Sequence, residues 1–145
     1  MLSKNQARIF FLGGTVVTFA VFIGLSWHSL STEVPKQTNS QNITTEVIAG
    51  KHLWESNNCM GCHTLFGEGA YYAPELTKVI ERRGVEYTKV VLTAKEPWAP
   101  RGRKMVAYNF SDEEAANLIE FFKWCGEADL NGFPAKPPYK SSSNK

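Results

Sequence analysis

The stretch CMGCHTLFGEGAYYAPEL, from Cys59 to Leu76, is the most informative part of this 145-residue chain. It sets two cysteines three positions apart, puts His63 directly after the second, and continues in a run rich in Gly, Tyr and Pro. The chain has one other cysteine, Cys125, and three thiols cannot form a disulfide framework. The first two cysteines must therefore be interpreted from their local spacing.

The pattern Cys59-x-x-Cys62-His63 has four interpretations. It is the signature of covalent c-type haem attachment, in which both thiols bond the haem and the adjacent histidine ligates the iron. A thioredoxin-like redox pair would need a βαβ context, whereas the flanking segments are predicted to be helical. Half of a zinc site would need a second ligand pair, which the sequence lacks, and chance is the fourth interpretation. The spacing and the following histidine favour haem c.

An electron-transferring haem iron needs a second axial ligand opposite His63. Met1 precedes the apolar N-terminal segment and Met60 lies between the two haem-bonding cysteines, which leaves Met105. A thioether ligand gives His/Met coordination, which raises the reduction potential. The alternatives are that this methionine only fills a gap in the core, or that His52 ligates the iron.

Several polar groups are candidates for supporting these ligands. The carbonyl of Pro74 could accept a hydrogen bond from the ring N–H of His63, or the proline could simply begin a helix. Trp98 and Tyr108 could hydrogen-bond haem propionates or only pack, and Cys125 is expected to be an inert buried thiol. A basic cluster could balance propionates, attract an acidic protein or merely be solvated; it comprises Arg82, Arg83, Lys95, Arg101, Arg103 and Lys104.

An apolar segment near the N-terminus predicts a single transmembrane anchor. The most apolar part, Ile9 to Trp27, has 19 residues and no Asp, Glu, Lys or Arg; as a helix it is roughly 28 Å long, against a bilayer core of roughly 30 Å. A cleaved signal peptide fits less well because the run is too long and lacks a small-residue cleavage site, and a buried core helix fits less well because both flanks are polar. Lys4 and Arg8 predict a cytoplasmic N-terminus, with the rest of the chain on the outer face.

Helical periodicity dominates the remainder, so the expected fold class is all-α. Apolar spacing predicts helices from Thr45 to about Asn58, over Glu75–Arg83, and from Ser111 to Gly126, the last with a capping box. Residues 87–94 could be helical or extended, and residues 96–109 are predicted to be a loop because they contain two prolines and a glycine. The 43% hydrophobic content is that of a globular protein, and the formal net charge of +2 leaves no basic stripe for nucleic acid.

These observations divide the chain into four parts. We expect a cytoplasmic stub and transmembrane anchor helix over residues 1–30 and a polar linker over residues 31–44. A mono-haem domain should follow over residues 45–130, and a C-terminal tail over residues 131–145.

The order of these features resembles class I cytochrome c over residues 45–126. That resemblance implies that the first and last helices cross beside the haem, with Gly50 and Phe122 at the crossing. A narrower resemblance is to the cytochrome c subunit of bacterial nitric oxide reductase, and it covers nearly the whole chain. It is carried by the anchor, GEGAYYAPEL, ERRG, and RGRKMVAYNF before SDEE. Cys125, and Val106 in place of a common proline, depart from the pattern.

The narrower resemblance implies an electron-transfer subunit that is not catalytic alone. It implies one haem c, covalently held by Cys59 and Cys62 with His63 and Met105 on the iron. A soluble periplasmic donor, such as a cytochrome c or a cupredoxin, would supply electrons to it. The partner would be a large multi-spanning subunit with haem b that reduces NO to N2O.

The same resemblance implies a location and an interface. The chain would be a single-pass protein of the bacterial inner membrane with its haem domain on the periplasmic side. Residues 67–72 would form an interface loop, with a calcium ion near the backbone carbonyls of Gly69 and Tyr71. The main alternative is a free-standing, membrane-tethered cytochrome c that shuttles electrons to a terminal oxidase. A haem sensor or enzyme with an open iron site, and a haem-free thiol oxidoreductase, are further alternatives.

Overall fold

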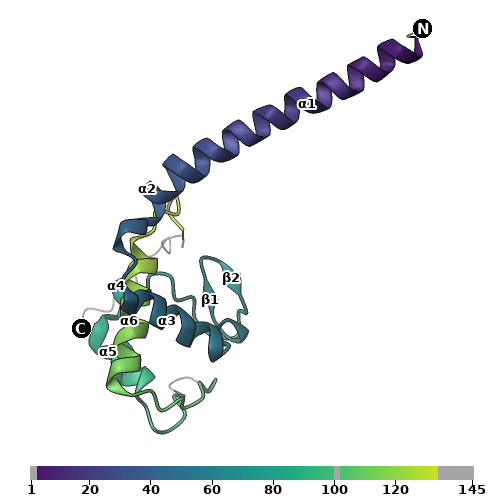
Figure 1. Ribbon diagram of the computed structural model, residues 1–145. Helices are drawn as coiled ribbons and strands as arrows, with labels where there is room; N and C mark the ends of the chain where they lie inside the picture. The colour runs from purple at the N-terminus through teal and green to yellow at the C-terminus, as the bar shows by residue number, and fades with distance from the viewer. Residues whose placement is uncertain (1–2, 100–101, 134–145) are drawn as a thin grey trace. The chain divides into compact units, whose positions relative to one another are not determined.

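The computed structural model describes residues 3–99 and 102–133, which are mostly helical, as the sequence predicts (Figure 1). They fall into two compact units, one up to Gln37 and one from Thr38 onward. The N-terminal elements are α1 Lys4–His28, a π-helical turn Ser29–Glu33, α2 Val34–Thr38 and a 3-10 turn Ser40–Asn42. The later elements are α3 Thr45–Ser56, a 3-10 turn Cys59–Gly61, β1 Thr64–Leu65, β2 Glu68–Gly69, α4 Val79–Arg83, α5 Val85–Leu92 and α6 Asp112–Glu127.

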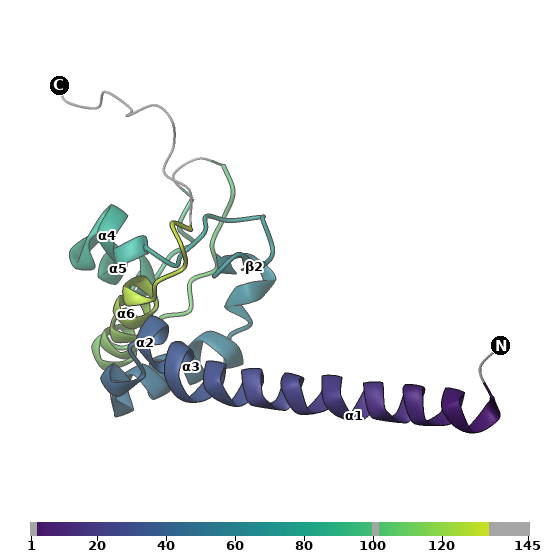
Figure 2. The same cartoon turned by 90° about the horizontal axis from the view of Figure 1, so that it is seen from above.

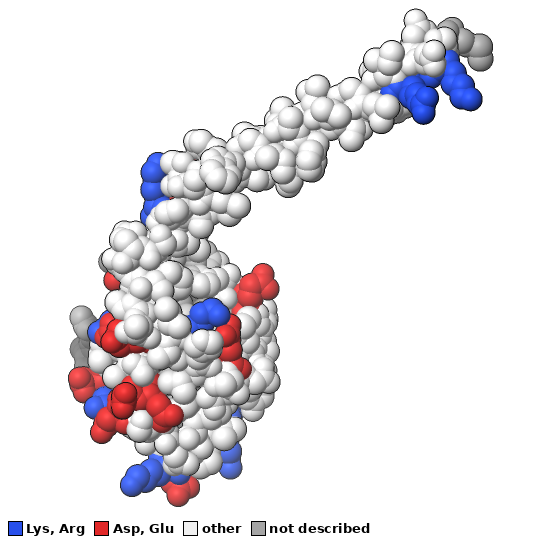
Figure 3. Space-filling view, viewed as in Figure 1, with Lys and Arg blue, Asp and Glu red and all other residues white. Residues whose placement is uncertain are grey.

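The N-terminal unit is one apolar helix of the length and composition that can cross a membrane. It runs without a break from Lys4 to Thr38, and its most apolar part has a mean hydropathy of 2.2 with no side chain buried. Figure 3 shows the middle of this helix free of charged side chains, with basic side chains gathered at its N-terminal end. This agrees with the predicted anchor.

The first part of the expected linker, residues 31–38, is helical. Pro35 has no backbone N–H, and in a regular α-helix its ring would clash with the carbonyl four residues earlier. The π-helical turn just before it widens the helix, and the N–H of Val34 bonds to the carbonyl of Ser29, five residues back. The helix thereby accommodates the proline, and the irregular segment is limited to residues 39–44.

The C-terminal unit is built around the packing of α3 against α6, which lie side by side (Figures 1 and 2). At Gly50 the two backbones nearly touch: a Cβ there would lie 2.1 Å from the carbonyl oxygen of Asn117 and 2.8 Å from the Cβ of Phe121. The resemblance correctly identified the glycine. Phe122 of α6 packs edge-on against Trp54 of α3, with ring centroids 5.7 Å apart.

Helix α6 begins as the sequence predicts. The Ser111 hydroxyl accepts a hydrogen bond from the N–H of Glu114 at 3.2 Å, and the Glu114 carboxylate accepts one from the N–H of Ser111 at 2.8 Å. This reciprocal capping satisfies N–H groups that have no partner inside the helix. The buried face of α6 consists of Ala115, Leu118, Ile119, Phe121, Phe122 and Cys125.

The middle of the chain departs from the predicted helices. The helix expected over Glu75–Arg83 is only α4, because the Glu75 carboxylate accepts a hydrogen bond from the N–H of Thr77 at 2.7 Å and holds a turn there. Gly84 ends α4 as predicted, at φ +80°. Residues 85–92 are helical, which settles the helix-or-extended alternative. The predicted tail falls almost wholly outside the described residues.

We predict that Gly50→Ala destabilises the C-terminal unit. Alanine normally stabilises a helix interior by about 1 kcal/mol relative to glycine, but here its methyl would meet the α6 backbone 2.1 Å away. Because overpacking costs up to about 3 kcal/mol, the free energy of unfolding should fall by about 2 kcal/mol or more in denaturant titrations.

A matched control is Ile48→Ala on the exposed face of the same helix, where the side chain is 47% exposed. It should change stability by no more than about 0.5 kcal/mol. Equal stabilities for the two variants would contradict the proposed backbone contact.

Candidate functional site

One cavity in the C-terminal unit brings together the sequence-predicted ligands. It has a volume of 680 Å³ and is lined by Cys59, Cys62, His63 and Met105, within the size range of cofactor sites. Its apolar wall includes Trp54, Leu76, Val79, Leu92, Phe110, Leu118 and Phe122. Two thiols, an imidazole and a thioether around an apolar cavity are the donor set that a covalently attached iron porphyrin requires. The residues present therefore fit the predicted haem.

The cysteines and the histidine share one tight turn. Helix α3 ends at Ser56, and Asn58 takes a left-handed conformation, φ +50°, before the 3-10 turn Cys59–Gly61. The N–H of His63 then bonds to the carbonyl of Cys59 at 2.9 Å. This geometry brings both thiols and the imidazole to the same cavity wall.

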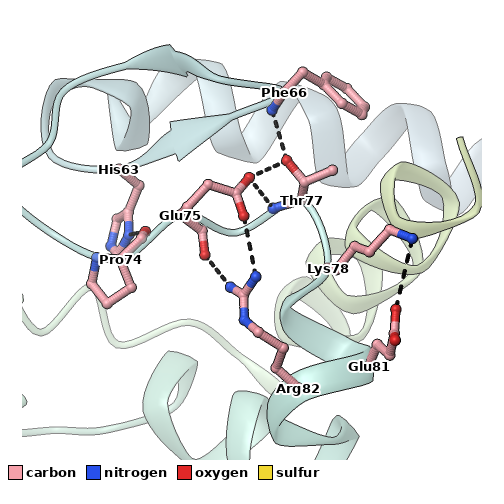
Figure 4. Close-up of polar contacts among 8 residues, drawn as sticks. All are labelled: His63, Phe66, Pro74, Glu75, Thr77, Lys78, Glu81 and Arg82. Atoms are coloured by element: carbon pink, nitrogen blue, oxygen red, sulfur yellow. Dashed lines mark hydrogen bonds and ion pairs between the residues drawn. The ribbon is translucent and has the colours of Figure 1, made fainter. Parts of the chain in front are cut away.

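His63 is held by the carbonyl of Pro74. The distance from Nδ1 to that oxygen is 2.7 Å, which is a hydrogen bond when Nδ1 carries the proton (Figure 4). Burial lowers the pKa of His63, while the bond to Pro74 opposes that shift. The imidazole is accordingly neutral at physiological pH, with the proton on Nδ1 and the lone pair on Nε2 available for a metal. Pro74 does not begin a helix, because α4 starts only at Val79.

Met105 reaches the cavity from the loop before α6. Its backbone pairs with Trp98 in an antiparallel bridge, with N–O distances of 2.9 and 3.1 Å. Its side chain is partly buried against the core. His52, the alternative ligand, lies exposed on α3 and does not line the cavity.

Much of the predicted basic cluster borders the same cavity. Arg82, Arg83, Arg103 and Lys104 are among the lining residues, whereas Lys95 is not. Arg101 lies outside the described residues. Four cations beside an apolar cavity are suited to pairing with carboxylates of a bound group.

Two aromatic side chains named from the sequence, Trp98 and Tyr108, also line the cavity. The Tyr108 hydroxyl donates a hydrogen bond to the carbonyl of Asn57 at 3.3 Å. Burial raises the pKa of Tyr108, so this hydroxyl is protonated at physiological pH and fastens the loop before α6 to the end of α3.

The Gly-rich run has a structural role that the sequence interpretation missed. Phe66, at φ +54°, and Gly67, at φ +84°, form the turn between β1 and β2. A Cβ at Gly69, where φ is +118°, would lie 2.3 Å from the carbonyl oxygen of His63. Glycine is therefore required for the hairpin to close against the ligand turn.

The same run presents aromatic side chains to solvent. Tyr71 is 80% exposed, and Tyr72 is also exposed. Throughout the described residues, no group of three or more His, Cys, Asp or Glu side chains could hold a metal ion. The calcium expected near Gly69 and Tyr71 thus has no side-chain cluster to support it there.

Sequence reasoning also missed Glu75 and Thr77, whose side chains organise the turn after Pro74 (Figure 4). Their two-residue spacing is that of a local turn in which a carboxylate accepts the N–H two positions later. That spacing was the only signal in the sequence, and it is too common to single out this pair.

The chain is similar to known proteins over most of its length. A family model described as cytochrome c matches residues 47–125. The chain is 42% identical to the C subunit of nitric oxide reductase from Stutzerimonas stutzeri, over 91% of this chain and 93% of the relative. It is 42% identical to the same subunit of Halomonas halodenitrificans, over 94% and 96% of the two chains, and 35% identical to that of Paracoccus denitrificans, over 92% and 95%.

We predict the number of reactive thiols. In the haem-loaded protein, Cys59 and Cys62 would be consumed by thioether bonds, and Cys125 is 0% exposed, with its pKa raised to about 12 by burial. Iodoacetamide at mildly alkaline pH should therefore label no cysteine in the folded protein and one after unfolding, as measured by intact mass. Cys125→Ala should remove that single label. Three labels after unfolding would contradict covalent attachment.

Proposed function

The chain belongs to the family of nitric oxide reductase C subunits, and on that premise we propose that it is the electron-accepting subunit of a membrane-bound nitric oxide reductase. It receives electrons from a soluble periplasmic donor, such as a cytochrome c or a cupredoxin. It delivers them to a large, multi-spanning, haem b-containing catalytic subunit that reduces NO to N2O. The observation that carries this proposal is the convergence of two thiols, His63 and Met105 on one cavity.

In this proposal Cys59 and Cys62 bond the haem covalently, and His63 and Met105 ligate its iron. The haem, when bound, supplies reversible one-electron chemistry. The 2.7 Å contact from His63 to Pro74 supports the histidine's part, since such a contact orients a ligating imidazole and increases its basicity. If His63 and Met105 both hold the iron, no position would remain for substrate, so the reduction of NO is assigned to the partner.

The proposed membrane arrangement follows from charge. Lys4 and Arg8 flank the apolar helix on its N-terminal side, and positive residues favour the cytoplasmic side of a bilayer. The chain would then cross the bacterial inner membrane once, with residues 45–130 folded in the periplasm as the haem domain.

The segment that follows the helix favours a fixed subunit over a free-standing shuttle. The Asn39 side chain donates a hydrogen bond to the backbone carbonyl of Glu127 at 3.0 Å, and Asn42 donates to the Glu127 carboxylate at 3.1 Å. The indole N–H of Trp124 donates to the carbonyl of Asn39 at 3.4 Å. A shuttle serving several oxidases needs a long free tether, whereas this short segment is fastened to α6.

We further propose that residues 67–72 contact the catalytic subunit. The exposed rings of Tyr71 and Tyr72 support this, because aromatic side chains are enriched at protein interfaces. A calcium ion at this contact, held by the carbonyls of Gly69 and Tyr71, is proposed on the family resemblance alone.

The deciding experiment is purification of the native complex through a tag on this chain in mild detergent. The reduced-minus-oxidised spectrum should contain both c-type and b-type haem signals, and the preparation should consume NO with an artificial electron donor. A c-type signal without a large partner would favour the tethered shuttle. Purified protein without any haem would favour the thiol oxidoreductase.

A second prediction tests the axial ligand. Met105→Ala should abolish the methionine-dependent absorption band of the oxidised protein and lower its reduction potential, because thioether ligation favours reduced iron. His52→Ala is the matched control, since His52 is exposed and outside the cavity, and its spectrum should be unchanged. An unaltered spectrum for Met105→Ala would support an open iron site, as in a sensor.

A further inference from the structure

A polar network immediately after Pro74 has no role in the function proposed above. The Glu75 carboxylate accepts hydrogen bonds from the N–H of Thr77, at 2.7 Å, and from the Thr77 hydroxyl. Its second oxygen accepts from the guanidinium of Arg82 at 3.2 Å, and Arg82 also donates to the backbone carbonyl of Glu75 (Figure 4). One carboxylate therefore joins the turn after Pro74 to α4.

Thr77 extends this network to the hairpin. Its side chain is fully buried, at 0% exposure. The hydroxyl donates to Glu75 and accepts a hydrogen bond from the N–H of Phe66 at 2.7 Å. Because both its donor and an acceptor position are used, this hydroxyl fixes the spacing between the turn and the hairpin.

The position of the Pro74 carbonyl depends on these neighbours. Proline has no N–H, so it cannot anchor its own backbone by donating a hydrogen bond. The flanking residues do so instead: the N–H of Ala73 bonds to the carbonyl of Cys62 at 2.8 Å, and that of Leu76 to the carbonyl of Thr64 at 2.9 Å. The Glu75 carboxylate closes the turn after Leu76, by accepting the hydrogen bond from the N–H of Thr77.

We propose that Glu75 is a positioning residue for His63. By holding the turn over residues 74–77, its carboxylate fixes the position of the Pro74 carbonyl. That carbonyl orients the His63 imidazole and accepts the hydrogen bond from its Nδ1 proton. This inference rests on the proposed role of His63 as an iron ligand. A firm Nδ1–H bond makes the imidazole a stronger donor to the metal, which favours oxidised iron. Loosening the turn should therefore raise the reduction potential.

The Glu75 carboxylate also influences the charge beside the cavity, through Arg82. Its side chain lines the cavity while its guanidinium is held by Glu75. Removing the Glu75 charge would change both the turn and the local electrostatics, so a potential shift in that variant alone could not identify positioning. A neutral change elsewhere in the network is needed to separate the two effects.

The test uses three variants of the full-length, haem-loaded protein in detergent: Glu75→Gln, Thr77→Val and Glu81→Gln. Thr77→Val removes the bridging hydroxyl without altering charge. Glu81→Gln is the control, because this carboxylate lies in α4, is 67% exposed and pairs with Lys78 at 3.8 Å (Figure 4). The measurements are solvent exchange of the His63 ring N–H by NMR in the reduced state, the reduction potential and the unfolding temperature.

We expect Glu75→Gln to accelerate ring N–H exchange about tenfold, the effect of weakening a charge-assisted hydrogen-bond network, and to raise the potential. Thr77→Val should also accelerate exchange and raise the potential, though less. Glu81→Gln should change neither quantity.

The proposal is overturned if the His63 ring N–H exchanges at the wild-type rate in both Glu75→Gln and Thr77→Val. This holds even if the reduction potential of Glu75→Gln shifts, because the lost charge alone can cause that shift. It also holds if the unfolding temperature is the only quantity that changes. If Glu75→Gln fails to incorporate haem, the exchange rate of the His63 ring N–H in Thr77→Val decides the question. Failure of the proposed ligand set looks different, since the wild-type protein would then carry no covalent haem or show no slowly exchanging His63 proton, and both proposals would fall.

Discussion

The contact between the backbones of α3 and α6 at Gly50 is the constraint on which the haem domain depends. No side chain separates the two helices at this point, because a Cβ would lie 2.1 Å from the carbonyl oxygen of Asn117. The approach brings Trp54 and Phe122 edge to face, and the ring of Trp54 lies 6.4 Å from that of His63 between centroids. The helix crossing therefore builds the cavity wall behind the ligand turn, and a wider crossing would leave the cofactor without a packed surface.

A second layer of structure rests on this crossing. The backbone of residues 70–77 runs along that of residues 60–66 and is bonded to it at several points, including the 3.0 Å bond from the N–H of Ala70 to the carbonyl of Met60. The same residues form the exposed aromatic loop and carry the carbonyl that holds His63. The proposed contact of residues 67–72 with the catalytic subunit and the proposed iron ligand His63 are thus parts of one hydrogen-bonded unit. This arrangement is economical for an electron-transfer protein, whose work is to hold a cofactor rigidly and close to its partner.

The end of the apolar N-terminal helix is explained by interactions that are equally local. The π-helical turn before Pro35 lets the helix continue through Thr38. Two residues that follow the helix, Asn39 and Asn42, donate hydrogen bonds to Glu127. The proposal of a fixed subunit draws on this short segment, since a shuttle would gain from a longer, freely moving tether.

Patterns confined to a few neighbouring residues were sufficient to predict the anchor, the capped helix at Ser111 and the haem-binding signature, because each acts within one or two turns of chain. The sequence also singled out Met105, by exclusion of the other methionines. It did not reveal the helical course of residues 31–38, the close approach of Gly69 to the ligand turn, or the carboxylate of Glu75 behind Pro74. Those features depend on which distant backbone groups come within hydrogen-bonding distance. Residue type and spacing by themselves therefore determined which candidate cofactor-binding residues the chain carries. Only the tertiary structure decided which neighbouring groups hold those residues in position, because it alone brings distant segments into contact.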